Sequence, residues 1–126
     1  MSNSLGRYRL GDKQRIPDKA SFARVLRSRQ RVQAGRLSLQ AVKNEGEAGR
    51  LGIAIAKRYA KRSVDRNWVK RVVREAFRLH CLKEHPADFL VALRAPLGGC
   101  KRRGERAALR TEVIALFEKA AQLVTK

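Results

Sequence analysis

The sequence predicts an α+β fold, a two-layer sandwich of helices on a small central sheet. Segments whose apolar residues recur every three or four positions, typical of helices, alternate with segments whose apolar residues recur every second position, typical of strands. Their order is helix, strand, strand, helix, strand, helix (αββαβα), without an internal repeat. A chain of 126 residues, 44% of them hydrophobic, is long enough for one buried core. We therefore predict a single domain over residues 18–126, preceded by a basic, poorly ordered arm over residues 1–17.

The individual elements follow from local patterns. Asp18 provides a start signal for a first helix, in which three apolar residues share one face. Residues 36–43 and 50–57 each alternate in polarity or size and flank the turn NEGEAG, which predicts that they pair as a hairpin. The remaining expected elements are a helix from Ser63, its expected cap, to Leu82, a strand over residues 88–96 and a helix over residues 105–124.

The helix predicted over residues 63–82 has two unlike faces. With about 100° of rotation per residue, its apolar residues fall within about half of the helical wheel. This apolar arc contains Val64, Trp68, Val69, Val72, Val73, Ala76 and Leu79, with Phe77 at its edge. The opposite arc, which we call the cationic ridge, contains Arg66, Asn67, Lys70, Arg71, Arg74 and Arg78. We expect the apolar arc to pack on the sheet and the ridge to face solvent.

The ridge differs from an ordinary solvated helix surface. Exposed helices usually mix acids with bases that pair at i and i+4, whereas the ridge contains no acid. Lys57, Arg58, Lys61 and Arg62, which we call the entrance cations, extend the positive charge to the start of the helix. The whole chain has 30 Lys and Arg against 11 Asp and Glu, a net charge of +19. This imbalance predicts a polyanionic partner.

A membrane and a nucleic acid are the two candidate polyanions. No segment has the roughly 20 apolar residues of a membrane-spanning helix and no secretion signal is visible, so we expect a cytoplasmic protein without a membrane partner. Cys81 and Cys100 do not have metal-ligand spacing, and His80 and His85 do not complete a site, so we expect free thiols and no bound metal. The carboxylates are scattered along the chain, which predicts that the protein supplies no catalytic residue.

Arginine predominates over lysine in the ridge and its surroundings, which favours RNA. A guanidinium can bind phosphate through two hydrogen bonds and can stack on a base, both of which suit folded RNA. No segment reads as a helix-turn-helix or a zinc module, which argues against sequence-specific DNA binding. Two alternatives stay open, a ribosomal or other structural RNA-binding protein without a catalytic role and a nonspecific DNA-compacting protein.

Residues 56–77, AKRYAKRSVDRNWVKRVVREAF, resemble the signature of the protein subunit of bacterial ribonuclease P. Lys57 and Arg58 match a pair of bases that follows the second strand in that family. The other matched positions are Arg66, Asn67, Lys70, Arg71, Arg74 and Phe77. Trp68 departs from the pattern, because the family usually has a second Arg after the Asn. Its indole either packs at the edge of the helix or stacks on a nucleotide.

The resemblance implies an αββαβα fold of the ribosomal protein S5 domain 2-like type, with a left-handed crossover where the general rule predicts a right-handed one. It also implies that the chain assists a catalytic RNA, together with Mg²⁺, in the endonucleolytic removal of the 5′ leader from precursor tRNA. The protein would bind no cofactor alone, and would be a monomer in a 1:1 ribonucleoprotein with the RNA subunit. The RNA-binding residues that the resemblance implies are Lys57, Arg58, Arg66, Asn67, Lys70, Arg71 and Arg74. The charge of the entrance and the helical wheel add Lys61, Arg62 and Arg78 to the expected RNA-binding surface.

The resemblance further implies a leader-binding cleft between the first helix and the sheet. Phe22, Ser38 and Gln40 are the residues expected to contact the leader. Gly52 and Ala54 are small and lie on the same predicted face, which leaves room for an extended RNA strand, while an aromatic ring can stack on a base. The alternative is that this face is simply solvated and that Phe22 belongs to the core.

Overall fold

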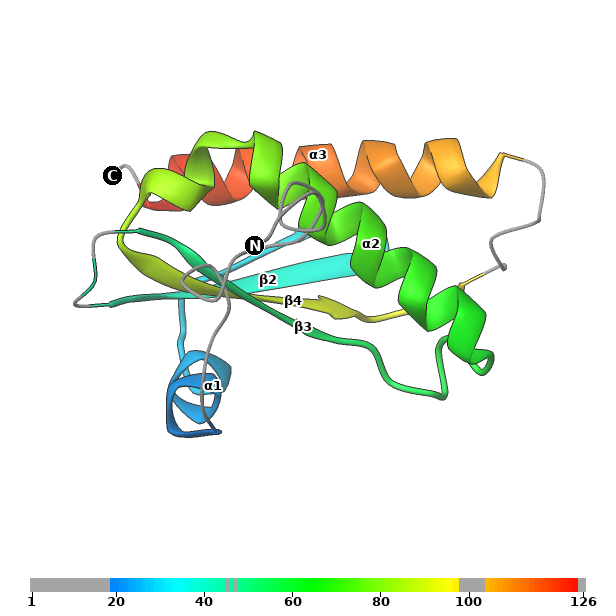
Figure 1. Ribbon diagram of the computed structural model, residues 1–126, viewed down its shortest axis with the longest axis horizontal. Helices are drawn as coiled ribbons and strands as arrows, with labels where there is room; N and C mark the ends of the chain where they lie inside the picture. The colour runs from blue at the N-terminus through cyan, green and yellow to red at the C-terminus, as the bar shows by residue number, and fades with distance from the viewer. Residues whose placement is uncertain (1–18, 45, 47, 98–103, 125–126) are drawn as a thin grey trace, which may run out of the picture.

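The computed structural model describes residues 19–44, 46, 48–97 and 104–124, and it confirms the predicted α+β sandwich. Two long helices cover one face of a four-stranded sheet and a short helix lies on the other face (Figure 1). The elements are α1 (Lys19–Leu26), β1 (Arg31–Ala34), β2 (Leu37–Lys43), β3 (Arg50–Ala54), α2 (Ser63–Leu79), the 3-10 helix η3 (Cys81–Glu84), β4 (Ala87–Leu93) and α3 (Glu105–Val124). The arm predicted over residues 1–17 lies outside the described residues.

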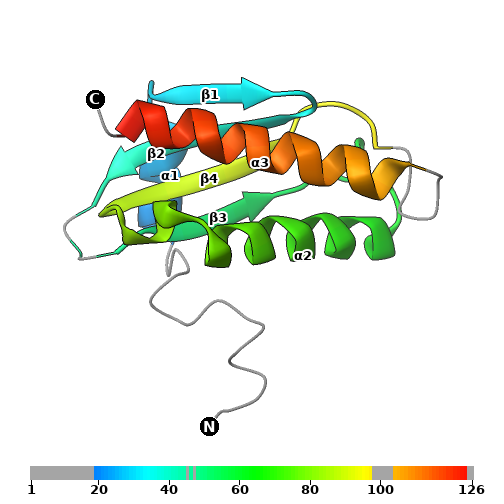
Figure 2. The ribbon, with the colours of Figure 1, turned by 90° about the horizontal axis from the view of Figure 1, so that it is seen from above.

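The order of strands in the sheet is β1-β2-β4-β3, seen from above in Figure 2. β2 pairs antiparallel with both β1 and β4, whereas β3 pairs with β4 in parallel. The predicted hairpin between residues 36–43 and 50–57 is therefore wrong, because β4 lies between these two segments. Alternation of polarity specifies which face a side chain occupies but does not name the neighbouring strand.

Strand β1 was not predicted, and it forms a tight hairpin with β2. Ala34 opposes Leu37 in the register, so the chain reverses at Gly35 and Arg36. Gly35 has a φ of +57°, a left-handed conformation that a residue with a Cβ atom adopts only at a cost. A β-carbon at Gly35 would also clash with the side chain of Glu112, so the glycine lets α3 lie close to the turn.

An ion cluster fixes this hairpin to α3. Nη2 of Arg36 lies 2.6 Å from Glu112 and its Nη1 lies 2.6 Å from Glu105, and the backbone N–H of Arg36 also donates to Glu112. The hydrogen bond to Glu112 is the main cause that raises the pKa of the Arg36 guanidinium. Burial raises the pKa of the Glu112 carboxyl, but the hydrogen bonds from Arg36 outweigh it and leave the pKa below its ordinary value.

The main core lies between the sheet and the two long helices. Fully buried side chains of β2 and β4 meet those of α2 and α3 there. Phe77 of α2 is central, since its ring centroid lies 5.9 Å from that of Phe89 and 6.1 Å from that of Phe117, in edge-to-face geometry. No helix among the described residues is long and apolar enough to cross a membrane.

Helix α1 packs on the opposite face of the sheet (Figure 1). Val25 of α1 is fully buried. The register places Ser38, Gln40 and Leu90 on this second face of the sheet. The side-chain amide of Gln40 donates to the carbonyls of Leu26 and Ser28, at 3.0 and 3.2 Å. These bonds tie the end of α1 to the middle of the sheet.

Candidate nucleic-acid interface

Helix α2 presents the amphipathic pattern that was predicted, with differences at its edges. Its buried residues include Val69, Val73 and Phe77, which confirms that the apolar arc packs on the sheet. Val64 and Leu79 were assigned to that arc, but their side chains are 46% and 71% exposed. Val64 lies in the first turn of α2, and Leu79 is its last residue and borders a hollow between α2 and α3.

The ends of α2 also differ from the prediction. Arg62 rather than Ser63 occupies the N-cap position, and no side chain caps the helix. The helix ends at Leu79 rather than Leu82, because His80 adopts an extended conformation and its Nδ1 accepts the backbone N–H of Leu82. This bond starts η3, and the imidazole packs 5.7 Å from the ring of Phe117.

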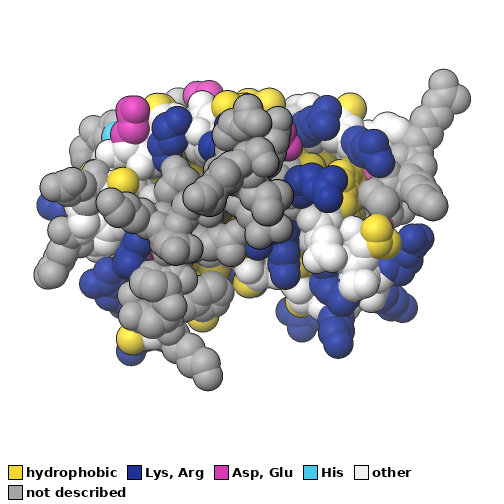
Figure 3. Space-filling view, in the orientation of Figure 1, with side chains coloured by type: hydrophobic (Ala, Val, Ile, Leu, Met, Phe, Trp, Pro, Cys, Tyr) yellow, Lys and Arg dark blue, Asp and Glu magenta, His cyan; other side chains and the backbone are white. Residues whose placement is uncertain are grey.

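The cationic ridge lies on the side of α2 that turns away from the core. Asn67 and Arg71 are exposed, and Arg66, Lys70, Arg74 and Arg78 are half-buried. Lys70 and Arg71 pair with no carboxylate of the described residues. Figure 3 shows Lys and Arg side chains gathered over the first turns of α2 and the loop before it, at the lower right. The structure therefore brings the ridge and the entrance cations together on one surface.

Arg66 makes two hydrogen bonds that the helical wheel does not reveal. Its Nη1 donates to the carbonyl oxygens of Ala60 and Lys61, at 2.9 and 2.8 Å. The guanidinium thus closes the loop that contains the entrance cations onto the first turn of α2. Because the partners are backbone atoms, no side-chain pattern in the sequence signals this contact.

The entrance cations are all exposed, on a loop that is itself fixed. Arg58 stacks on the ring of Tyr59 at 4.8 Å, and the carbonyl of Tyr59 accepts the backbone N–H of Leu97. Arg62 lies 3.9 Å from the buried carboxylate of Asp65, which neutralises part of its charge. The other entrance cations, Lys57, Arg58 and Lys61, pair with no carboxylate among the described residues.

Trp68 is half-buried and packs against the main core. This position favours the interpretation of edge packing over base stacking, because contact with the core withholds part of the ring from a nucleotide. The residue that replaces the second arginine of the signature therefore contributes to the attachment of α2.

The residues predicted to contact a leader lie on the α1 side of the sheet, and their roles stay predictions. Ser38 is 1% exposed, and its hydroxyl accepts Nε of Arg94 at 3.0 Å. Gln40 is 7% exposed, with its amide donors engaged by the end of α1. Phe22 belongs to α1, but its side chain is not among those described.

No group of three or more His, Cys, Asp or Glu side chains in the described ranges lies close enough together to hold a metal ion. Asp88 is completely buried, but Arg50 and Asn44 occupy its oxygens at 2.7 to 2.9 Å. Cys81 is an exposed free thiol, as predicted, while Cys100 lies outside the described residues.

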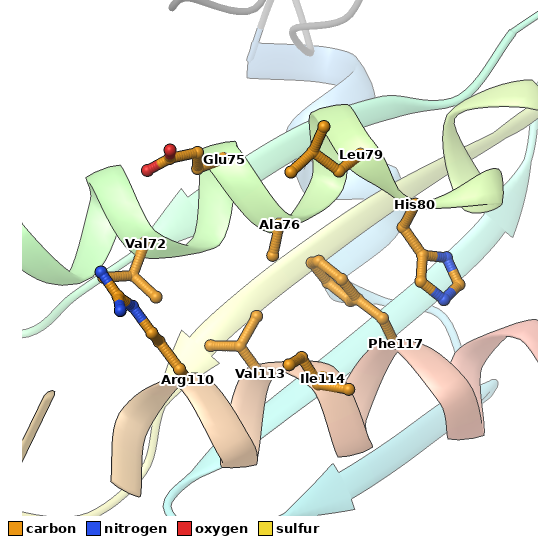
Figure 4. Close-up of a pocket in the computed structure, with 9 residues that line it drawn as sticks. All are labelled: Val72, Glu75, Ala76, Leu79, His80, Arg110, Val113, Ile114 and Phe117. Carbon is orange, nitrogen blue, oxygen red and sulfur yellow. The ribbon is translucent and has the colours of Figure 1, made fainter. Parts of the chain in front are cut away.

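A hollow of about 360 Å³ between α2 and α3 was missed by sequence reasoning (Figure 4). Its lining is mostly apolar and includes Leu79 and Ile114, both more than half exposed, and Glu75 and Arg110 lie at its rim. Val72 and Ala76 face it from α2, about 200° around the helix from Lys70 and Arg74 of the ridge. This hollow therefore lies on a different surface from the ridge.

A family model described as Ribonuclease P matches residues 10–121 of the chain. The ribonuclease P protein component of Thioalkalivibrio sulfidiphilus is 44% identical over 66 residues, which is 52% of this chain and 55% of that relative. The corresponding protein of Paraburkholderia xenovorans is 40% identical over 86 residues, 64% of this chain and 62% of the relative. The chain thus spans between 55% and 62% of these two curated relatives.

Solved structures show the same fold. The RNase P protein of Staphylococcus aureus superimposes with a TM-score of 0.68 at 25% identity, covering 85% of this chain and 94% of that protein. The RNase P protein of Thermotoga maritima gives a TM-score of 0.60 at 22% identity, covering 87% and 94%. The match of the family model to almost the whole domain, together with this fold and the basic signature on α2, shows that the chain belongs to the ribonuclease P protein family.

Proposed function

We propose that this protein is the protein subunit of a ribonuclease P, which assists a catalytic RNA in the endonucleolytic removal of the 5′ leader from precursor tRNA. The RNA subunit and the precursor tRNA are its partners, in a 1:1 ribonucleoprotein that acts in the cytoplasm. Family membership supports this reading over that of a ribosomal or other structural RNA-binding protein. The observation on which the proposal rests is the ridge on the outer side of α2, since the half-buried Lys70 and the exposed Arg71 offer positive charge that no described carboxylate neutralises.

The ridge and the entrance cations would bind the RNA subunit. Arginine and lysine side chains that converge on one surface bind phosphates and release counterions, which gives affinity without reading base sequence. Arg66 would act through its two backbone hydrogen bonds as well, because they hold the entrance loop beside the ridge. A fixed loop loses less conformational freedom on binding than a mobile one.

The α1 face of the sheet would hold the leader. Ser38 and Gln40 lie on this face, and Gly52 and Ala54 pair with Leu90 and Ala92 on the same side. Small side chains permit the close approach of an extended strand, and Phe22 is the proposed stacking residue. Gln40 would act mainly by holding α1, because its amide hydrogens are already donated to two carbonyl groups.

The chemistry itself is assigned to the RNA subunit and to Mg²⁺ ions bound with it. The described side chains include no cluster suited to a catalytic metal, so no step of the reaction is assigned to a residue of the protein. The contribution of the protein is binding and positioning, which can lower a barrier by holding the reacting groups in a productive geometry.

Reconstitution tests the proposed function. The purified protein is mixed with the ribonuclease P RNA from the same organism at low Mg²⁺, where the RNA alone is slow, and cleavage of precursor tRNA is measured. We expect the protein to restore leader removal at the correct phosphodiester bond. A K70E/R71E variant that folds normally serves as the matched inactive control, and a wild-type protein that gives no stimulation over RNA alone contradicts the proposal.

A further inference from the structure

A second group of exposed arginines lies far from the ridge, in the segment RSRQR. Arg27 and Arg29 are in the turn after α1, and Arg31 is the first residue of β1. All three side chains are exposed, and none pairs with a carboxylate of the described residues. We call this group the arginine turn.

The backbone beneath the arginine turn is held rigidly. The hydroxyl of Ser28 donates to the carbonyl of Ala41 and accepts the backbone N–H of Gln30, while the N–H of Ala41 donates to the carbonyl of Gln30. Gln40, nine-tenths buried, adds its two bonds to the carbonyls of Leu26 and Ser28. Ser28 thus points toward the sheet, and the arginines on either side of it project outward from a fixed base.

The arginine turn and the ridge are on opposite faces and near opposite edges of the sheet. Arg31 pairs with Gln40, so its side chain shares the face of α1. The ridge belongs to α2, which covers the other face on the side of β3, as Figures 1 and 2 show together. Three strand spacings of about 4.8 Å separate the edge strands β1 and β3. The two groups therefore cannot bind the same phosphate.

We propose that Arg27, Arg29 and Arg31 form a second phosphate-binding surface, which takes a separate segment of folded RNA while the ridge holds the first. This inference rests on the proposed function, because it assumes that RNA is the ligand of the ridge. Three guanidinium groups can each bind phosphate oxygens bidentately. The hydrogen-bonded backbone that carries them has little conformational freedom left to lose on binding. The protein thereby binds two segments of RNA on opposite faces of one small sheet.

The test compares variants that remove the same number of charges from different surfaces. R27Q/R29Q removes two charges from the arginine turn, K70Q/R71Q removes two from the ridge, and R110Q/K119Q removes two from α3. Affinity for the folded RNA subunit is measured over a series of KCl concentrations. We expect R27Q/R29Q to reduce the slope of log affinity against log salt by about 1.4 to 1.8, with little change for R110Q/K119Q.

Backbone footprinting of the RNA identifies the two segments. Wild-type protein should protect two separate segments, R27Q/R29Q should lose one of them, and K70Q/R71Q should lose the other. The same assay with precursor tRNA, with and without its leader, shows whether the second segment belongs to the RNA subunit or to the substrate. Thermal unfolding of each variant confirms that the domain is folded.

The outcomes separate this proposal from the proposed function. If R27Q/R29Q matches the α3 control in slope and footprint while K70Q/R71Q loses protection, the second surface does not exist and the proposed function stands. If neither variant differs from the control, the proposed function fails as well. If R27Q/R29Q weakens binding to anionic vesicles or duplex DNA but leaves RNA binding unchanged, the second surface serves another polyanion and the proposal is overturned.

Discussion

Arginines occupy two opposite electrostatic settings in this protein. On the ridge, Arg71 is exposed and pairs with no carboxylate of the described residues. At one end of β3, Arg50 donates Nε and Nη2 to the two oxygens of the fully buried Asp88, each at 2.7 Å. At the turn between β1 and β2, Arg36 binds two glutamates of α3.

This difference separates the arginines that hold the fold from those that are free to bind a ligand. A guanidinium paired with a buried carboxylate contributes little net charge to the surface. The pair is costly to break, because no water reaches the buried carboxylate to replace the guanidinium. An unpaired guanidinium contributes little to stability but retains its full attraction for phosphate. A net charge of +19 therefore overstates how many cations are available, and pairing identifies which ones are.

Removal of the buried Asp88 carboxylate, which accepts hydrogen bonds from Arg50 and Asn44, should have the largest effect on stability. Asp88→Ala leaves Arg50 and Asn44 without their shared acceptor, so we expect the free energy of unfolding to fall by about 3 to 5 kcal/mol, measured by urea denaturation. RNA affinity of the folded fraction should be unchanged. Asp88→Asn keeps one acceptor oxygen and should cost less. A loss of under 1 kcal/mol for Asp88→Ala would show that the cluster does not stabilise the fold.

The ridge should respond in the opposite way. K70E/R71E removes two unpaired charges and adds two repulsive ones, so we expect RNA affinity to fall at least tenfold, equivalent to about 1.4 kcal/mol, in a filter-binding or fluorescence titration. The unfolding free energy should stay within about 0.5 kcal/mol of wild type, since both residues lie on the solvent side of α2. R110E/K119E is the matched reversal away from the ridge. Equal losses in the two variants would mean that overall charge, rather than the ridge, determines affinity.

Substitution of Gly35 tests whether the turn between β1 and β2 needs a residue without a Cβ atom. Gly35→Ala imposes a left-handed conformation on a residue with a Cβ atom, which costs about 1 to 2 kcal/mol, and it also displaces the carboxylate of Glu112. We expect a lower melting temperature with unchanged RNA binding. Gly104→Ala, at the other described glycine with a positive φ, adds a Cβ atom that meets no atom within 4 Å, so it separates backbone strain from the displacement of Glu112. A variant as stable as wild type would show that the turn relaxes without strain.

Loss of the negative charge of Glu112 should have the smallest effect on the free energy of unfolding. The pKa of this carboxyl is lower in the folded protein than in the unfolded chain, so its stabilising contribution is complete above the unfolded pKa and is lost as the pH falls through the folded pKa. Glu112→Gln should therefore be less stable than wild type at neutral pH, by on the order of 0.5 to 1 kcal/mol, since the pair is partly exposed. In urea denaturation at a series of pH values, this difference should shrink in acid. A constant difference would indicate that the charge of Glu112 does not contribute.

Much of the fold could be predicted from short stretches of sequence. The helix over residues 105–124 was placed correctly, and the alternation in residues 36–43 assigned Leu37 and Leu39 to the core face and Ser38 to the other. The pairing of strands could not be predicted, because β4 inserts between β2 and β3 through contacts distant in sequence. Strand β1 is four residues long, too short for alternation to distinguish it from a turn.

The candidate site could likewise be predicted only in part. Residues that share a helix face, such as Lys70 and Arg74, could be grouped from their spacing alone. The hydrogen bonds of Arg66 to backbone carbonyls and those of Gln40 to the end of α1 could not be foreseen, because backbone acceptors have no sequence signature. The location of the arginine turn and the ridge on opposite faces could not be foreseen either, because it depends on which face of the sheet each element covers.

By itself the sequence determined the composition of each surface: a helix with valines on one side and cations on the other, and an excess of bases that predicts an anionic partner. Helical and strand periodicity are local properties, so a single chain segment is sufficient to specify them. Only the tertiary structure decided which arginines are neutralised and which stay free, because Asp88, Glu105 and Glu112 reach their partners from other elements. Pairing of charges depends on distance in space, and that distance exists only once the sheet and helices are packed.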